Sequence, residues 1–323
     1  MTENTRYEVV VVGGGAAGLS AALVLGRARR RTLVVDAGEP RNAPSAHMQG
    51  YLSRDGVSPA EFLAVGREEI ARYGVELVRD RVVDATRDAS GDGDGNGNGD
   101  GDFAVVLAGG RTVRARQLVV ATGLKDELPP VPGLAERFGR DVLHCPYCHG
   151  WESRDLPTGV LATSALSVHQ ALMVTQWSKD VRLFLHEVSE SELTDQDLRR
   201  LAAAGVTVVP GEVAELVLTD DRLTGVRLAD GTVHAREVLY TAPRAVPRND
   251  LLVRLGAELR ETPFGSYPVI DERGLTSVPG LWAAGNASGF AEQVVNAASR
   301  GYRAGAAING ELLMADLDAA VRV

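Results

Sequence analysis

The stretch that decides the fold is Tyr7-Glu8-Val9-Val10-Val11-Val12-Gly13-Gly14-Gly15-Ala16-Ala17-Gly18. It begins as an apolar run typical of a buried parallel strand and ends with the spacing G-x-G-x-x-G. Leu19 to Arg29 then has the apolar spacing of a helix, and a second strand-like run, Arg31 to Val35, ends at Asp36. Strand, glycine turn, helix, strand and acid form the complete fingerprint of a dinucleotide-binding unit.

Each fingerprint residue has a physical role. Gly13 allows the tight turn, and Gly15 lets the backbone approach a pyrophosphate that sits on the helix N-terminus, where Ala16 follows. Gly18 lets the helix pack closely on the strand, and the Asp36 carboxylate can accept from a ribose hydroxyl. The fingerprint does not distinguish FAD from NAD.

Outward from the fingerprint, the chain alternates strands, helices and loops. The loop Ala37 to Gly56 contains Arg41, Asn42 and His47, which can line a cofactor or be ordinary polar loop residues. Ser90 to Asp102 is a low-complexity Gly/Asp run and predicts a flexible hairpin tip. The other elements predicted here are a helix over Pro59 to Tyr73, short strands over Val75 to Val78 and Arg81 to Thr86, a hairpin of Phe103 to Leu107 with Thr112 to Val113, and a buried strand over Gln117 to Ala121 that ends at Thr122-Gly123.

Length and composition exclude several functions. A chain of 323 residues predicts two domains, and 45% hydrophobic residues are ordinary for a soluble protein. The formal net charge of -9 and a pI near 5.3 argue against nucleic acid and anionic membranes as partners. No apolar stretch is long enough to span a bilayer and no signal peptide is visible, so the expected location is the cytoplasm. There a structural disulfide is disfavoured and a redox-active one is plausible.

Both cysteines lie in Cys145-Pro146-Tyr147-Cys148-His149-Gly150. A C-x-x-C pair can exchange a disulfide, supply half of a zinc site or, with the following His, attach a c-type haem. Haem attachment requires export, and zinc requires further ligands although the sequence has no second C-x-x-C. Cys-Pro-Tyr-Cys is also a glutaredoxin tetrapeptide, but here it stands in a dinucleotide-binding chain, which favours a redox disulfide without bound metal.

The fingerprint, Ala121-Thr122-Gly123, the C-x-x-C and the C-terminal run Gly280-Leu281-Trp282-Ala283-Ala284-Gly285-Asn286 together resemble the low-molecular-weight thioredoxin reductase family of flavoproteins. The resemblance covers essentially the whole chain. It implies an α/β fold of two Rossmann-like, three-layer domains and a homodimer. Residues 1–124 and 241–323 would form the FAD-binding domain, and residues 125–240 an inserted domain that carries the C-x-x-C.

The resemblance also assigns the cofactor and its residues. The family's aspartate that holds the flavin ribitol is replaced here by Asn286, which can still hydrogen-bond a hydroxyl. Gln293 and Val294 match the start of a helix that faces the flavin pyrimidine ring. The expected FAD-binding residues are Gly13, Gly15, Ala16, Gly18, Asp36, Arg41, Asn42, Val83, Ala121, Thr122, Gly123, Gly285, Asn286, Gln293 and Val294.

The second nucleotide unit departs from the family pattern. Strand, helix and strand are predicted over Gly159 to Ala162, Val168 to Trp177 and Val181 to Leu185, but the turn Thr163 to Ser167 has no glycine. Side chains would stand where a pyrophosphate needs bare backbone. The second strand is followed by His186-Glu187-Val188-Ser189-Glu190, where NADPH-using members carry a basic cluster. We therefore expect a domain that keeps the fold and has lost NADPH.

The resemblance assigns the sulfur roles: Cys148 faces the flavin and Cys145 exchanges with substrate. His149 stands where reductases carry an acidic residue, and an imidazole there can act as acid or base. His144 is a second candidate for catalysis, with a structural role as the alternative.

The run Cys145 to Glu152 and the glycine-free turn look like the dithiol oxidases of the gliotoxin and holomycin pathways. This implies FAD-dependent oxidation of a small-molecule dithiol, with dioxygen reduced to hydrogen peroxide. The alternatives are a reductase that passes electrons from ferredoxin or NADPH to thioredoxin, and a non-catalytic flavoprotein that sequesters a dithiol.

Overall fold

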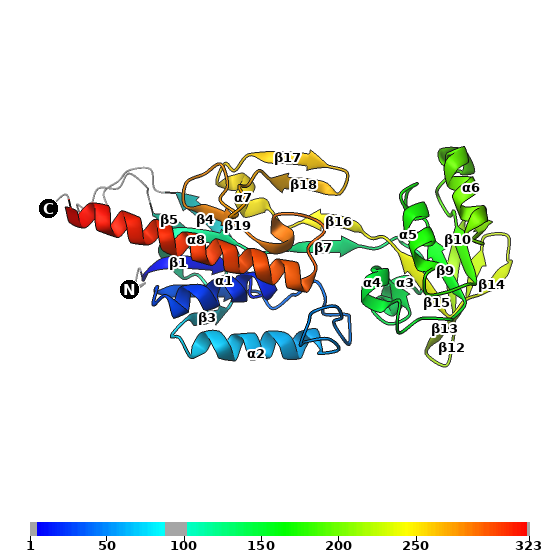
Figure 1. Ribbon diagram of the computed structural model, residues 1–323, viewed down its shortest axis with the longest axis horizontal. Coiled ribbons are helices and arrows are strands. Elements are labelled where there is room, and N and C mark those ends of the chain that lie inside the picture. The colour runs from blue at the N-terminus through cyan, green and yellow to red at the C-terminus, as the bar shows by residue number, and fades with distance from the viewer. Residues whose placement is uncertain (1–4, 88–101, 322–323) are drawn as a thin grey trace. The chain divides into compact units, whose positions relative to one another are not determined.

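The computed structural model describes residues 5–87 and 102–321, and the chain divides into two compact units (Figure 1). The first comprises Met1–Ala43, Pro59–Lys125 and Ala245–Val323, and the second comprises Pro44–Ser58 and Asp126–Arg244. The low-complexity run from Ser90 lies outside the described residues, apart from its last residue. The chain therefore leaves the first unit and returns to it. The connecting segments β7 (Leu124–Glu127) and β16 (Arg244–Pro247) pair with each other.

Two boundaries differ from those expected. The return to the first unit follows Arg244 rather than residue 240, because β16 continues the chain beyond the last sheet strand of the second unit. Pro44–Ser58 belongs to the second unit although the sequence placed it in the first. The reason is local packing: a Cβ on Gly139 would lie 2.6 Å from the Pro44 carbonyl oxygen.

A seven-stranded sheet is the centre of the first unit, in the order β3-β2-β1-β6-β5-β4, with β19 also paired to β6. Strands β3, β2, β1, β6 and β19 pair in parallel, and β5 and β4 continue antiparallel. The bounds of the strands and helices are β1 Arg6–Val12, α1 Ala16–Arg27, β2 Thr32–Asp36, α2 Pro59–Ala71, β3 Glu76–Arg79, β4 Val82–Arg87, β5 Phe103–Leu107, β6 Thr112–Val120, α7 Asp250–Arg254, β17 Leu259–Thr262, β18 Gly265–Pro268, β19 Leu281–Ala283, the 3-10 turn η2 Gly285–Ala287, and α8 Val294–Val321.

The two strands expected at Thr112 to Val113 and Gln117 to Ala121 are one strand, β6. Its first half alternates between buried and half-buried residues, because it pairs with β5 in an antiparallel hairpin. Its second half is continuously buried, because β1 and β19 pair with it on both sides. The burial pattern changes from alternating to continuous within this one strand, which is why the sequence predicted two strands.

Helices α1 and α8 lie side by side on the sheet (Figure 1). Two glycines allow this contact: a Cβ on Gly301 would lie 1.9 Å from the Ala17 carbonyl oxygen, and one on Gly305 would lie 2.7 Å from that of Ala21. The two backbones therefore touch. Side chains of α1, α2 and α8 pack on one face of the sheet, and α7 packs with side chains of the strands on the other. This confirms the predicted α/β, three-layer class for the first unit.

The second unit has a five-stranded parallel sheet in the order β11-β10-β9-β15-β8. Helices α5 and α6 pack on one face, and the antiparallel sheet β12-β13-β14 packs on the other. The bounds are α3 Leu134–Arg137, β8 Val142–Leu143, α4 Pro146–His149, β9 Thr158–Leu161, α5 Ser167–Val174, β10 Val181–Phe184, the 3-10 turn η1 Glu190–Glu192, α6 Asp195–Ala203, β11 Thr207–Val209, β12 Val213–Thr219, β13 Arg222–Leu228, β14 Val233–Ala235 and β15 Val238–Thr241.

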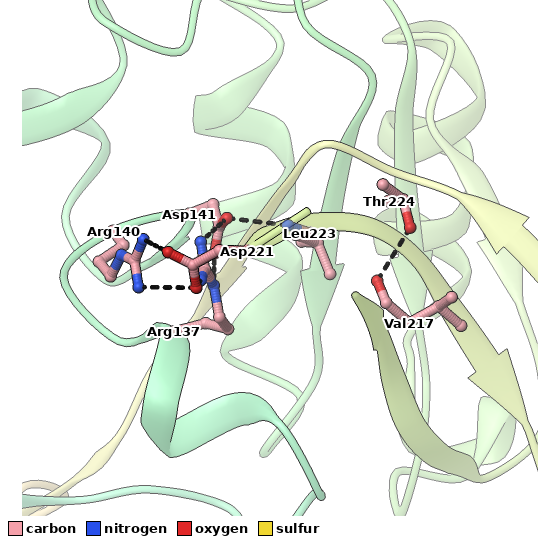
Figure 2. A network of polar contacts seen from close by, with 7 residues as sticks. All are labelled: Arg137, Arg140, Asp141, Val217, Asp221, Leu223 and Thr224. Atoms are coloured by element: carbon pink, nitrogen blue, oxygen red, sulfur yellow. Dashed lines mark hydrogen bonds and ion pairs between the residues drawn. The ribbon is translucent and has the colours of Figure 1, made fainter. Parts of the chain in front are cut away.

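An ion-pair network holds the start of β8, the strand that leads to the cysteines (Figure 2). Arg137, only 3% exposed, donates from Nε to Asp141 at 2.8 Å and from Nη1 to Asp221 at 2.7 Å. Asp141 also accepts from the Leu223 amide at 2.9 Å, and Arg140 adds a second pair with Asp221. The residue before β8 is thus tied to the β12–β13 hairpin.

Candidate active site

The glycine turn of the first unit is closed on one side by the end of β6. Gly13 has φ +107°, and a Cβ there would lie 2.3 Å from the Ala121 carbonyl oxygen. The Ala121 amide donates to the Val12 carbonyl at 2.8 Å. Glycine is required at this position because two strand ends meet here, so Gly13 lies beside Ala121.

The N-terminus of α1 is open on its other side. A Cβ on Gly15 would meet no heavy atom within 4 Å. Within the part of the chain that the structure describes, the amides of Ala16 and Ala17 have no hydrogen-bond acceptor, and the Leu19 amide is the first to bond back, to Gly15 at 2.9 Å. Unpaired amides and the positive end of a helix dipole beside open space form a cradle that fits a pyrophosphate.

Asp36 ends β2 and faces the same turn. One carboxylate oxygen accepts from the amides of Gly14 and Gly38, each at 3.2 Å, and the other accepts from Arg79 at 2.6 Å. A carboxylate can accept about four hydrogen bonds, so a ribose hydroxyl still fits here. Arg79 was not predicted from the sequence, because only the parallel pairing of β2 with β3 brings it opposite Asp36.

The C-terminal motif reaches the same place. Gly285 has φ +65°, its Cβ would lie 2.8 Å from that of Ala17, and the Ala284 amide donates to the Val120 carbonyl at 3.1 Å. Asn286 donates from Nδ2 to the carbonyls of Gly289 and Phe290, at 3.2 and 2.9 Å, which leaves Oδ1 to accept from a ligand hydroxyl.

The start of α8 follows this motif along the chain. The Gln293 carbonyl accepts from the Ala297 amide at 2.8 Å, and Val294 is the first residue of the helix. Their amides are thus at a helix N-terminus, as the sequence predicts for the pair.

For the remaining residues that the sequence predicts to bind FAD, the structure gives positions but less direct evidence of a ligand contact. Arg41 and Asn42 are half-buried in the turn after β2. Thr122 donates from Oγ1 to the Arg248 carbonyl at 2.6 Å, and Gly123, at φ +71°, accepts from the Arg248 amide at 3.1 Å, so both hold the returning chain. Val83 lies on the outer strand β4, which β5 and β6 separate from β1.

In the second unit the cysteines lie at the carboxyl edge of the parallel sheet. Strand β8 ends at Leu143, and one short helical turn, α4, starts after Cys145 and contains Cys148. The amides of Cys148 and His149 donate to the Cys145 carbonyl at 3.1 and 3.2 Å, so the two cysteines share one turn. Both are half-buried, which suits thiols that exchange with a substrate.

His149 is the titratable side chain of this turn. Burial lowers its pKa below the ordinary value of 6.5, and the nearby Glu152 carboxylate only partly opposes this. Near neutral pH the imidazole is therefore uncharged and can accept a proton. His144 is half-buried, and its carbonyl accepts from Gln170 Nε2 at 2.6 Å, so its backbone has a structural role.

Two aromatic side chains border the cysteines. Tyr147 is 72% exposed and Trp151 is 66% exposed. The Gly150 amide donates to the Pro146 carbonyl at 2.7 Å and Ser153 to His149 at 3.1 Å, so the turn continues helically past α4. Residues four apart in such a segment lie on one side of it. Both exposed rings are near the cysteines in sequence; the Tyr147 ring meets the Trp177 ring edge-on, and the Arg154 guanidinium lies over the Trp151 ring.

The turn of the second nucleotide unit is closed. The amides of Ser167, Val168 and His169 donate to the carbonyls of residues 164, 165 and 166, and the Thr163 amide donates to Ser167 Oγ at 3.1 Å. The Thr163 amide is thus used inside the turn, and exposed side chains of residues 163–166 stand where the first unit has its glycines. After β10, His186 Nδ1 accepts from the Val213 amide at 3.1 Å, and exposed Glu187 and Glu190 follow.

The fold and the two sites define a dinucleotide-binding protein with a redox C-x-x-C pair, the class of the flavin-linked disulfide oxidoreductases. The chain belongs to the pyridine nucleotide-disulphide oxidoreductase family, whose model matches residues 7–301. Thioredoxin reductase-like flavoproteins of this family use FAD, which confirms the predicted cofactor, and the open cradle at Gly15 fits it.

The chain is similar to named relatives along its whole length. A protein named thioredoxin reductase sirT, from Leptosphaeria maculans, is 32% identical, and the alignment covers 97% of this chain and 96% of the relative. The crystal structure of HlmI has 49% identity and TM-score 0.91 and covers 100% of this chain and 97% of its own. An oxidoreductase from Agrobacterium tumefaciens has 37% identity and TM-score 0.86, with 96% and 99% covered.

One further structural finding concerns membranes. Within residues 5–87 and 102–321, every helix is too short or too polar to cross a bilayer.

Proposed function

We propose that this chain is an FAD-dependent dithiol oxidase, which closes a disulfide within a small-molecule dithiol and passes the electron pair to dioxygen. The observation that carries the proposal is the contrast between the two nucleotide turns. The first has open space at Gly15 beside the amides of Ala16 and Ala17, and the second has no glycine and carries exposed side chains from Thr163 to Leu166. A flavin enzyme without a nicotinamide site must receive its electrons through the cysteines.

The charges after β10 also argue against a site for NADPH. NADPH carries a phosphate on its adenosine ribose, and a site for it needs basic side chains. Here Glu187 and Glu190 follow the strand, and His186 has its Nδ1 occupied by the Val213 amide. Two carboxylates would repel that phosphate.

The protonation state of His149 also favours oxidation. Closing a substrate disulfide removes two thiol protons and two electrons, and the Cys145–Cys148 bond breaks as it accepts the electron pair. An uncharged His149 can take a substrate proton on a ring nitrogen. When bound, FAD accepts the electron pair from the reduced cysteines and transfers it to dioxygen, which becomes hydrogen peroxide. The flat surfaces of Tyr147 and Trp151 offer stacking contacts to a small substrate.

The test is oxygen uptake by the FAD-loaded protein with dithiothreitol as the probe dithiol, followed with an oxygen electrode and a peroxide assay. We expect one hydrogen peroxide per dithiol oxidised, and none with the Cys145→Ser protein. Absence of oxygen uptake with dithiothreitol and with other small dithiols contradicts the proposal.

A thioredoxin reductase-like reductase is the competing function, and the names of relatives such as sirT favour it. Anaerobic mixing with NADPH, watched at the flavin absorbance, separates the two. We expect bleaching by dithiothreitol and none by NADPH on the same timescale. Fast bleaching by NADPH assigns the chain to the reductases.

A further inference from the structure

Tyr240 is a buried phenol directly beside the strand that ends at the cysteines. It lies on β15, is 1% exposed, and pairs in parallel register with Leu143 of β8. Leu143 is two residues before Cys145. A tyrosine buried this completely needs a hydrogen-bond partner for its hydroxyl, and it finds one in the segment that follows α4.

That partner is Ser153, also buried. The Ser153 Oγ and the Tyr240 hydroxyl are 2.8 Å apart, and the Ser153 hydroxyl donates to the His149 carbonyl at 2.9 Å. A serine has one proton to donate, so Tyr240 is the donor to Ser153. The Ser153 amide reaches the same His149 carbonyl at 3.1 Å. A chain of two hydrogen bonds thus connects the central sheet to the peptide of His149.

The surroundings keep the Tyr240 hydroxyl protonated, so the direction of these two hydrogen bonds is fixed. Burial raises the pKa of Tyr240 to about 12, and Ser153 partly opposes the rise, while negative charge on Cys145, Glu152 and Cys148 increases it. The phenol therefore stays a donor at every working pH. On the other side of the turn the Trp177 ring lies against Gly150, where a Cβ would come within 2.5 Å. The turn is held from both sides.

We propose that Tyr240 is a positioning residue of the dithiol site, whose hydroxyl acts through Ser153 to hold His149 and the cysteine turn against the sheet. This holds the half-buried His149 ring in its position near Glu152. The inference concerns the site of the proposed dithiol oxidase and rests on it for its kinetic consequence, but the position of His149 can be measured without turnover.

The experiment compares Tyr240→Phe and Ser153→Ala with wild type. The His149 ring is titrated by NMR in the FAD-loaded protein and assigned by the signal missing from His149→Gln. Each variant frees the turn and admits water to a ring whose pKa is lowered by burial. We expect the midpoint to rise by about half a pH unit or more toward the ordinary value.

Kinetics give the second readout. We expect kcat with dithiothreitol to fall about tenfold with KM nearly unchanged, and the rising limb of the pH profile to move to higher pH with the NMR midpoint. The double variant should lose no more than either single variant, because the two hydroxyls act in series.

Tyr267→Phe is the matched control. This tyrosine of the first unit is equally buried, at 1% exposure, and its hydroxyl donates to the Phe264 carbonyl at 3.2 Å. It should leave the His149 midpoint unchanged. An unchanged midpoint in both Tyr240→Phe and Ser153→Ala overturns the inference. A shifted midpoint in a protein that oxidises no dithiol keeps the inference and removes the proposed function instead.

Discussion

At the scale of single residues, the dithiol site combines two sulfurs and one base on a single turn. Cys145 precedes α4 and Cys148 lies within it, so their environments differ although their exposure is similar. His149 follows directly, and its partial burial lowers its pKa, so it is uncharged near neutral pH. The sulfur roles and the base can therefore be tested separately.

The cysteines should differ in what they retain. Cys145→Ser and Cys148→Ser should both abolish dithiol oxidation, because one sulfur cannot store an electron pair as a disulfide. With a symmetric disulfide reagent, Cys148→Ser should keep a stable mixed disulfide at Cys145, detected by mass spectrometry. Wild type should release it, because Cys148 resolves it. Faster and more complete labelling of Cys145→Ser than of Cys148→Ser would reverse the two roles.

His149 should set the acid limb of turnover. Its pKa is lowered by burial, so the imidazole remains a base below pH 6.5 and loses activity only when pH falls further, through its own pKa. His149→Ala should remove this limb and slow turnover on the order of 10²-fold, while FAD stays bound. Steady-state rates across pH measure both effects. If the alanine variant keeps the limb, the proton acceptor is another group and His144 is the next to test.

At the scale of elements, the two strand–turn–helix units have the same fold, but the turns before their helices differ. At α1 a glycine turn leaves amides and open space, and at α5 a glycine-free turn carries exposed side chains. The two units therefore share one topology although their turns differ.

Gly15 offers a clean test of the first site. Its backbone is extended, at φ -79° and ψ -174°, and a Cβ there meets no protein atom. Gly15→Val should leave the unfolding free energy of the apoprotein almost unchanged. It should weaken FAD binding about tenfold to 100-fold, because a side chain overlapping the pyrophosphate costs about 1–3 kcal/mol. Gly310→Val, also in open space, is the control and should bind FAD normally. Equal FAD affinity in both variants contradicts this cradle.

The two ion pairs before β8 should contribute unequally to the stability of the second unit. Asp141→Ala leaves the guanidinium of nearly buried Arg137 without its bidentate partner and also removes an acceptor from the Leu223 amide. We expect a loss of about 3 kcal/mol in the unfolding of the second unit. Asp221 is largely exposed, and Asp221→Ala should cost much less. Urea denaturation monitored by circular dichroism compares the two variants. Equal losses would show that the buried Arg137–Asp141 pair contributes no more to stability than the exposed one.

At the scale of the whole molecule, the chain forms two units with separate hydrophobic cores. The first core gathers residues from both ends of the chain around β1 and β6, and the second surrounds β9 and β15. A ligand or a substitution in one unit should therefore act mainly on the stability of that unit.

Calorimetry tests this independence. We expect FAD to raise the Tm of one transition, that of the first unit, by mass action. Asp141→Ala should lower the Tm of the other transition and leave the FAD-dependent one in place. Both changes falling on a single transition would show that the two units unfold cooperatively.

The sequence alone determined the features that depend on local spacing. The glycine fingerprint, the C-x-x-C and the missing glycines of Thr163 to Ser167 each follow from neighbouring residues, so the α/β class and a dinucleotide site could be predicted. The resemblance to the family then implied FAD and the place of Gly285 and Ala121 in the first site.

Only the tertiary structure decided which distant side chains meet. Strand pairing brings Tyr240 beside Leu143 and Arg79 opposite Asp36, and no local pattern announces either pair. The partial burial that lowers the pKa of His149 likewise depends on the folded structure. The physical reason is that local spacing sets the backbone of a turn, whereas the polarity and hydrogen bonding of its side chains depend on what the fold packs around them.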